Sequence, residues 1–161
     1  MMYCTTMDSP LGLLSIVSDG SAITGLWMEG QRFFGPTEKA QPKDDLPVLK
    51  EAATWLCAYF SGKNPGRLPP LAPHGTDFQK RVWQQLLKVP PGRTISYGEL
   101  AKALHCPSPR AVGQAVGRNP IAILIPCHRV IGAGKKPGGY AGGTVRKAFL
   151  LSLEQISAGG G

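Results

Sequence analysis

The sequence predicts an α+β protein of two domains, and three observations support this. Short β-rich segments and one helical pattern occupy residues 1–73, helical patterns dominate residues 74–161, and a proline-rich stretch lies where the two halves meet. Charge divides at the same place. Residues 1–73 carry six basic and seven acidic side chains, a net charge of about −1, whereas residues 74–161 carry twelve basic and three acidic side chains, about +9.

A strongly basic half beside a nearly neutral half is typical of a polyanion-binding domain with a second domain attached. The alternative is a basic solvent-exposed surface that has no partner. The composition excludes a membrane span, because the longest apolar run, 121–126, is only as long as a strand. No secretory signal is apparent, so we expect a cytoplasmic protein with reduced thiols.

The first half begins with two expected strands, 11–17 and 22–28, which follow the turn sequences Pro10-Leu11-Gly12 and Asp19-Gly20. Apolar residues at helical spacing then predict a helix over 46–60, with Cys57 in the core. The segment 64–73 contains four prolines and is expected to be a linker. We therefore place the domains at 1–73 and 74–161.

The second half opens with a helix to Lys88, capped by Thr76 or Asp77. Residues 94–96 are expected to be extended. Ser96 then caps a helix over 97–104, with Glu99 completing a capping box. A turn at 107–109 leads to a helix over 110–117, so the last two helices form a candidate helix-turn-helix.

The second helix of this pair is built almost entirely of small residues. A helix that reads base edges in the major groove needs long polar side chains, and residues 111–117 offer only Gln114. Such a helix would fit DNA by shape, in the minor groove, with Arg110 at its start long enough to enter a base stack. The alternative is close packing against another helix.

The strongest chemical motif is Ile125-Pro126-Cys127-His128-Arg129, at the end of the apolar run. The thiolate is the nucleophilic form of cysteine, and a neighbouring base or positive charge lowers the thiol pKa. We therefore expect Cys127 to be an activated nucleophile of lowered pKa.

This motif, together with Arg110-Ala111-Val112-Gly113, Asn119-Pro120, 139–143 and 150–154, resembles the O6-alkylguanine-DNA alkyltransferases, also called methylated-DNA–protein-cysteine methyltransferases. The resemblance covers the second half and extends more weakly to Asp8-Ser9-Pro10-Leu11-Gly12 and 76–83. It implies a ribonuclease H-like first domain and a mainly helical second domain with a winged helix-turn-helix. It also implies irreversible, single-turnover transfer of an alkyl group from DNA to Cys127, after minor-groove binding and nucleotide flipping.

The resemblance assigns a role to each matching residue. His128 would act as base through a water, Glu154 would orient it, Asn119 would tie the recognition helix to the active-site strand, and Tyr97 would help rotate the target phosphate or donate a proton. The expected substrate-binding residues are Val130, Tyr140, Ala141 and Lys147. The expected DNA-binding residues are Arg110, Ala111, Gly113, Gln114, Ala115, Thr94, Ser96 and Arg118.

We expect no cofactor and no metal, because the lesion itself carries the alkyl group and residues 1–73 contain no histidine. The implied partner is double-stranded DNA containing O6-alkylguanine, and O4-alkylthymine as a second lesion, bound by a monomer, with clustering along DNA left open. Gly139 and Ala141 depart from the pattern of several relatives, which leaves the tolerance of bulky adducts open. The alternative functions are a non-catalytic lesion-binding relative, which Cys127 disfavours, and a helix-turn-helix regulator with a redox cysteine.

Overall fold

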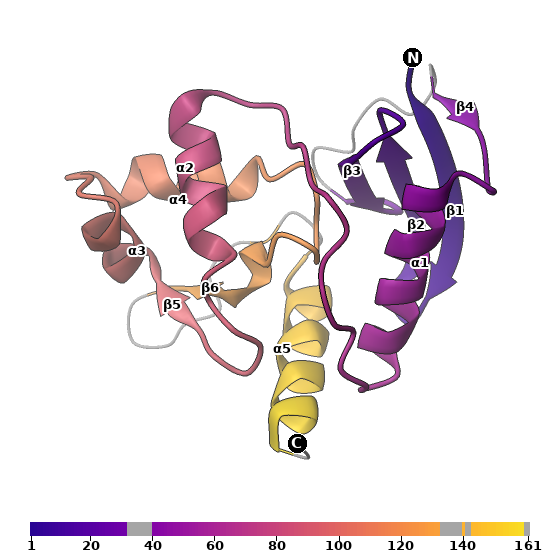
Figure 1. Ribbon diagram of the computed structural model, residues 1–161. Coiled ribbons are helices and arrows are strands. Elements are labelled where there is room, and N and C mark those ends of the chain that lie inside the picture. The colour runs from indigo at the N-terminus through magenta and orange to yellow at the C-terminus, as the bar shows by residue number, and fades with distance from the viewer. Residues whose placement is uncertain (32–39, 133–139, 141–142, 160–161) are drawn as a thin grey trace. The chain divides into compact units, whose positions relative to one another are not determined.

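The computed structural model describes residues 1–31, 40–132, 140 and 143–159 (Figure 1). Contacts divide the chain into two compact units. The first contains residues 1–74 and 120–124, and the second contains residues 75–119 and 125–161. The expected second domain thus gives a five-residue segment to the first unit. None of the helices within the described ranges is long and apolar enough to cross a membrane.

The first unit is a four-stranded sheet with one helix packed against it (Figure 1). Its elements are β1 (Tyr3–Ser9), β2 (Gly12–Ser18), β3 (Ile23–Met28), β4 (Gln41–Pro42) and α1 (Pro47–Phe60). The strand order is β3-β2-β1-β4, with β4 parallel to β1 and the other pairs antiparallel. Strand β1 was not predicted from the sequence, because its polar residues give only a weak strand pattern.

The outer edge of β3 is covered by two segments that are not strands. Ile23 exchanges backbone hydrogen bonds with Pro70 and Ala72, both of 2.8 Å, so part of the expected linker packs against the sheet. Leu26 does the same with Pro120 (2.9 Å) and Ala122 (3.1 Å). All six residues of β3 are buried as a result.

The second unit is mainly helical, as expected. Its elements are α2 (Asp77–Leu86), β5 (Ile95–Ser96), α3 (Tyr97–Ala103), α4 (Pro109–Gly117), the 3-10 turn η1 (Cys127–Arg129), β6 (Val130–Ile131) and α5 (Thr144–Gly159). Helices α3 and α4 pack against each other and α2 packs against both, while the assignment of α3 and α4 as a helix-turn-helix stays a prediction. Strands β5 and β6 form a parallel two-stranded ladder, and its role as a wing stays a prediction.

The capping residues chosen from the sequence are confirmed. Thr76 Oγ1 accepts from Gln79 N, Ser96 Oγ accepts from Glu99 N, and both caps are complete capping boxes. Ser108 caps α4 and accepts from Ala111 N at 3.1 Å, so this helix begins one residue earlier than expected. These side chains satisfy amide groups that the first helical turn cannot pair internally.

Two expectations were wrong. Cys57 is exposed, because it lies seven residues after exposed Lys50, two helical turns along the solvent face of α1. Residues 121–126 do not form a strand: Leu124 N donates to Ala122 O (2.7 Å), and Ile123 has a φ of 69°. The active-site strand that the family resemblance implied here is therefore an irregular segment whose apolar residues are buried.

Candidate active site

Cys127 lies at the start of η1, where the chain makes a tight turn. Its amide donates to Ile125 O at 2.8 Å, and the side chain is only 6% exposed. Ile123, four residues before it, is buried in the left-handed region, which costs a β-branched residue about 1–3 kcal/mol. The packing around this segment therefore fixes a backbone path that the local sequence disfavours.

The expectation of a lowered cysteine pKa was wrong for the protein without substrate. Burial raises the pKa of the Cys127 thiol to about 11, although a hydrogen bond with the Asn119 side chain and the charge of Lys147 both lower it. Its neighbours in sequence do not offset the burial, because the His128 and Arg129 side chains both bind Glu154. The resting residue is thus a neutral thiol, and a nucleophilic thiolate requires a base at the moment of reaction.

Asn119 connects the end of α4 to the segment that carries the sulfur, as expected. Its Nδ2 donates to Ile125 O at 2.9 Å, its backbone N donates to Val116 O at 3.2 Å, and its side chain also reaches the sulfur of Cys127. The residue is buried, so these bonds are shielded from water. One side chain therefore fixes the position of the nucleophile relative to the helix-turn-helix.

His128 is fully buried and bound to a single carboxylate. Its Nε2 lies 2.6 Å from Glu154 Oε2, and burial lowers the histidine pKa although the carboxylate opposes that effect. An ionised carboxylate can only accept, so Nε2 carries the proton and Nδ1 of the neutral ring has a free lone pair. Among the described residues, Nδ1 has no hydrogen-bond partner. This nitrogen is the available base.

Arg129 holds the carboxylate from the other side. Its Nε donates to Glu154 Oε1 at 2.8 Å and its Nη2 to Oε2 at 2.9 Å, while Nη1 donates to Val89 O at 2.6 Å. Burial raises the pKa of Glu154, but the hydrogen bonds from His128 and Arg129 outweigh it and lower the pKa to about 2. Glu154 is therefore a fixed negative charge, in a fixed orientation, at neutral pH.

Arg129 was expected from the sequence to contribute only its charge. A pattern that could have identified it is the scarcity of acids: residues 74–161 contain only Asp77, Glu99 and Glu154. The first two lie in the first turns of α2 and α3, where acids favour the helix dipole. Glu154 was thus the remaining candidate for pairing with a buried arginine.

Helix α5 presents Lys147 and Glu154 on one buried face, two turns apart. Lys147 Nζ donates to Val130 O, and burial lowers the lysine pKa while a charged Cys127 would raise it. The ammonium therefore lies close enough to stabilise a thiolate on Cys127. The Val130 carbonyl, expected to accept from the extruded base, has a second lone pair for that purpose.

Tyr97 reaches the same region through the β5–β6 ladder. Ile95 pairs with Val130 and Ser96 with Ile131, so the residue after β5 is held beside the segment that carries the sulfur. Burial raises the pKa of Tyr97, and so does the proximity of Cys127. A phenol of raised pKa stays protonated and can act as a donor at neutral pH.

Of the expected loop residues, Tyr140 is described and Ala141 is not. The Tyr140 ring lies edge-on to the His128 ring, with centroids 6.4 Å apart and an interplanar angle of 83°. Ala141 and Gly139 lie outside the described residues.

The expected DNA-binding residues fall into two groups. Those at the surface, exposed or half-buried, are Thr94, Ser96, Arg110, Ala111, Gly113, Gln114 and Arg118. Ala115 is 3% exposed and its carbonyl accepts from Trp83 Nε1 at 2.9 Å, so the assignment of Ala115 to the DNA surface was wrong. A β-carbon on Gly113 would lie 3.5 Å from the Tyr97 ring, which shows how closely that ring packs on α4.

The arrangement combines a buried thiol, a neutral base polarised by a fixed carboxylate, and a nearby ammonium. These are the components of nucleophilic group transfer, in which a nucleophile, a base and an orienting group act in sequence. No group of three or more candidate metal ligands occurs in the described part of the chain.

The chain matches two family models from one family. Residues 2–66 match the 6-O-methylguanine DNA methyltransferase ribonuclease-like domain, and residues 77–156 match the DNA binding domain of the same family. Among curated proteins, the methylated-DNA–protein-cysteine methyltransferase of Mycobacterium leprae is 46% identical over 156 residues, covering 96% of this chain and 93% of the relative. The constitutive methyltransferase of Bacillus subtilis is 42% identical, with 98% of each chain covered.

Solved structures give the same result. The Mycobacterium tuberculosis O6-methylguanine methyltransferase superimposes with a TM-score of 0.88 at 45% identity, covering 98% of this chain and 94% of that one. The M. tuberculosis protein described as OGT in complex with DNA also has a TM-score of 0.88, at 44% identity, with 96% of this chain and 94% of that chain covered.

Proposed function

This chain belongs to the 6-O-methylguanine DNA methyltransferase family of DNA repair proteins, which transfer an alkyl group from DNA to their own cysteine, and we propose that its acceptor is Cys127. The single observation that supports this most directly is the hydrogen bonding around the sulfur. Cys127 is hydrogen-bonded to the Asn119 side chain. The adjacent His128 donates from Nε2 to Glu154 and keeps a free lone pair on Nδ1. The other cysteines, Cys4, Cys57 and Cys106, lie outside this network.

The first chemical step is removal of the thiol proton. His128 Nδ1 takes it through a bridging water, since a buried nitrogen of this kind is normally satisfied by an ordered water. Glu154 stabilises the imidazolium that forms, and Lys147 stabilises the developing thiolate. A thiol of raised pKa therefore reacts only while base and substrate are both in place.

The second step is in-line displacement at the alkyl carbon. The sulfur–carbon bond forms, the bond between that carbon and O6 of guanine breaks, and its electron pair goes to the guanine. A proton then completes the neutral base, and Tyr97, whose pKa is raised, is the donor we assign. The thioether has no leaving group that water could displace readily, so each molecule acts once.

We propose that O6-alkylguanine in double-stranded DNA is the substrate and O4-alkylthymine a second one. The alkyl group points into the stack of a duplex, so the nucleotide must be extruded before the sulfur can reach it. The small, half-buried residues of α4 suit the minor groove, and Arg110 can fill the vacated space. The Val130 carbonyl, Tyr140 and Ala141 would receive the extruded base.

The remaining assignments follow from these. We propose two domains. Residues 1–73 form the α+β domain, and residues 74–161 form the domain that binds DNA and carries out alkyl transfer. We also propose a monomer that needs no cofactor and acts in the cytoplasm, on nucleoid DNA when bound. A net charge of about +9 in the second half supports binding that is largely independent of sequence and weakens steeply with salt.

The test is the intact mass of the protein after mixing with a duplex that contains one O6-methylguanine. We expect a single addition of one methyl group, and peptide mapping should place it on Cys127. Modification of Cys4, Cys57 or Cys106 instead would overturn the assignment. A strong consensus in a binding selection, without methyl transfer, would favour the regulator alternative.

A further inference from the structure

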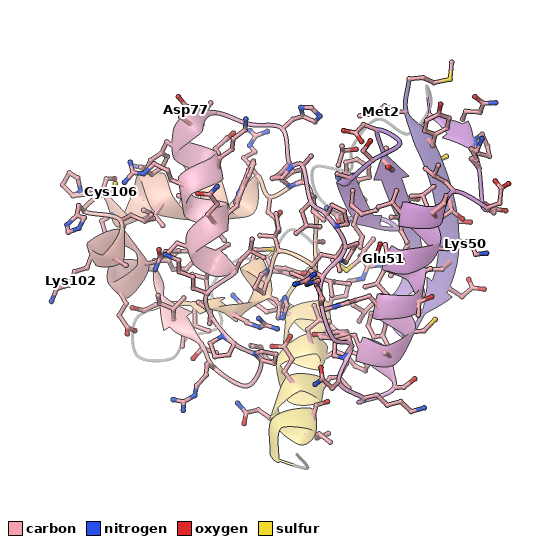
Figure 2. All side chains as sticks on the ribbon, viewed as in Figure 1. Met2, Lys50, Glu51, Asp77, Lys102 and Cys106 are labelled. Atoms are coloured by element: carbon pink, nitrogen blue, oxygen red, sulfur yellow. The ribbon has the colours of Figure 1, made fainter. Side chains whose placement is uncertain are left out.

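Helix α2 contacts both helices of the proposed helix-turn-helix through two residues that lie two positions apart in its sequence, Arg81 and Trp83. Arg81 Nη2 donates to Leu104 O at 3.0 Å, and Trp83 Nε1 donates to Ala115 O at 2.9 Å. The first acceptor is the C-cap of α3, and the second lies in the last turns of α4. Figure 2 shows Asp77 at the start of this helix and Lys102 and Cys106 near the end of α3.

The carbonyl that Arg81 binds is not used by the ending of α3 itself. Leu104 N donates to Leu100 O (3.1 Å), His105 N to Lys102 O (3.1 Å) and Cys106 N to Ala101 O (2.9 Å). This is the pattern of a Schellman ending, which consumes earlier carbonyls of the helix. Leu104 O takes no part in that ending and is available to Arg81. The negative C-terminal end of the helix dipole also stabilises the guanidinium there.

The carbonyl that Trp83 binds is deeply buried. Trp83 is 1% exposed, and a β-carbon on Gly75 would lie 2.5 Å from its ring, so the indole is tightly enclosed. Ala115 O also accepts from Arg118 N at 3.2 Å, which closes the end of α4. A rigid ring thus fixes α4 at the opposite end from Arg110, the second residue of that helix.

Taken together, these contacts fix the orientation of α3 relative to α4 from a third helix. We propose that Arg81 and Trp83 are positioning residues for lesion extrusion: they hold the helix-turn-helix in the orientation that delivers Arg110 to the duplex. This inference rests on the proposed function. The Arg81 contact lies at the end of α3 opposite Tyr97, the residue of that helix that we assign to the active site. Leu104 is seven residues from Tyr97, about 10 Å along the helix axis.

The test compares two substrates and three variants. Arg81→Met removes the donor but keeps an apolar stem, Trp83→Phe removes the N–H but keeps a ring, and Lys80→Met is the matched control. Lys80 is exposed, precedes Arg81, and loses the same charge. Rates would be measured at saturating duplex carrying O6-methylguanine, and with free O6-benzylguanine, which needs no extrusion.

We expect Arg81→Met and Trp83→Phe to slow duplex repair about tenfold and to leave the free-base rate within a factor of two of wild type, which also reports correct folding. Lys80→Met should leave both rates at wild-type values. Arg81→Met should change the salt dependence of DNA affinity no more than Lys80→Met does, since each removes one positive charge.

Three results would overturn the inference. The first is unchanged duplex rates in both α2 variants. The second is equal slowing on both substrates, which would show that α2 supports the active site itself. The third is equal slowing by Arg81→Met and Lys80→Met, which would show that charge alone matters. Wild-type protein that fails to methylate Cys127 would instead overturn the proposed function, so the two failures are distinguishable.

Discussion

The buried centre around Cys127 and the outer surface of α4 belong to the same unit but are built in opposite ways. In the centre, the side chains of Asn119, Arg129 and Glu154 each make at least one directed hydrogen bond away from solvent. On α4, half of the surface positions are Ala or Gly, and Arg110 is a long charged side chain at the helix start. The chemistry at Cys127 needs side chains in a defined orientation, whereas the surface of α4 needs a backbone that can approach DNA closely.

This difference indicates that chemistry and delivery can be separated by mutation. Changes in the centre should slow transfer from any substrate, because they act on the thiol, the base or its orientation. Changes on α4 should slow only substrates that must be extruded from a duplex. Asn119 is where the two regions meet, since it bonds to both the end of α4 and the segment that carries Cys127.

The largest effect is expected from Cys127→Ser. A hydroxyl in this buried site has a far higher pKa than the thiol and is a much weaker nucleophile, so transfer should be abolished on duplex and free base alike. DNA binding should persist, because it depends on the basic surface. Intact mass and a gel-shift assay measure the two properties. Loss of DNA binding in a folded Cys127→Ser protein would contradict the separation.

Glu154→Gln should be next. The amide cannot hold the Nε2 proton as a carboxylate does, and the imidazolium loses its stabilising charge, so we expect both substrates to react about 10²–10⁴-fold more slowly. Single-turnover rates with each substrate test this. Gln155→Ala is the control, because its side chain bonds only to Gly92 O among the contacts described for it. A defect confined to the duplex would show that Glu154 serves delivery instead.

Arg110→Ala should produce the opposite pattern. Without a side chain to fill the vacated stack, the extruded state loses a few kcal/mol, and duplex repair should slow about 10–100-fold. The reaction of free O6-benzylguanine should keep its wild-type rate. Arg118→Ala, exposed near the other end of α4, removes the same charge and controls for phosphate binding. Equal slowing on both substrates would mean that Arg110 supports the active site.

A smaller effect is expected in the dependence of stability on pH. The pKa of Glu154 is about 2 in the folded protein against 4.5 for an ordinary glutamate, so its contribution is present above pH 4.5 and is lost as pH falls toward 2. Between pH 6 and pH 3.5 this amounts to about 1 kcal/mol. Burial also lowers the pKa of His128, which adds a loss of stability as pH falls below 6.5.

Urea unfolding of wild type and Glu154→Gln at pH 6, 5 and 3.5 would measure this. The wild-type free energy of unfolding should fall more steeply than that of the variant between pH 5 and 3.5. If the free energies of unfolding of wild type and variant fell equally with pH in that window, the pKa of Glu154 would not be lowered in the folded protein.

The sequence predicted what local rules determine. Thr76 and Ser96 cap their helices because a hydroxyl there can accept from an amide three residues on, whatever the rest of the chain does. The motif around Cys127 likewise indicated a nucleophilic sulfur, whereas the roles of His128 and Glu154 came from the family resemblance.

The features that were not predicted correctly share another cause, because they depend on burial and on contacts between residues distant in sequence. Ile123 adopts a positive φ that its own side chain disfavours, so the surrounding packing decides the backbone there. The thiol pKa of Cys127 follows from burial, which adjacent residues do not reveal. Arg129 and Glu154 are 25 residues apart, and Ala115 is buried by a helix that begins at Asp77.

The smallest expected effect tests the helix-turn-helix alone. His105 has a φ of 54° at the end of α3, a left-handed conformation that glycine adopts without strain. Its side chain is exposed, so His105→Gly should stabilise the protein by about 0.5–1 kcal/mol and leave both transfer rates unchanged. His105→Ala is the control, because it removes the imidazole and keeps the β-carbon that causes the strain. The measurement is the midpoint of urea unfolding, compared between proteins whose unfolding free energy depends equally on urea concentration. A gain of equal size in both variants would assign the cost to the imidazole, and a loss in His105→Gly would show that the turn between α3 and α4 is not strained at this position.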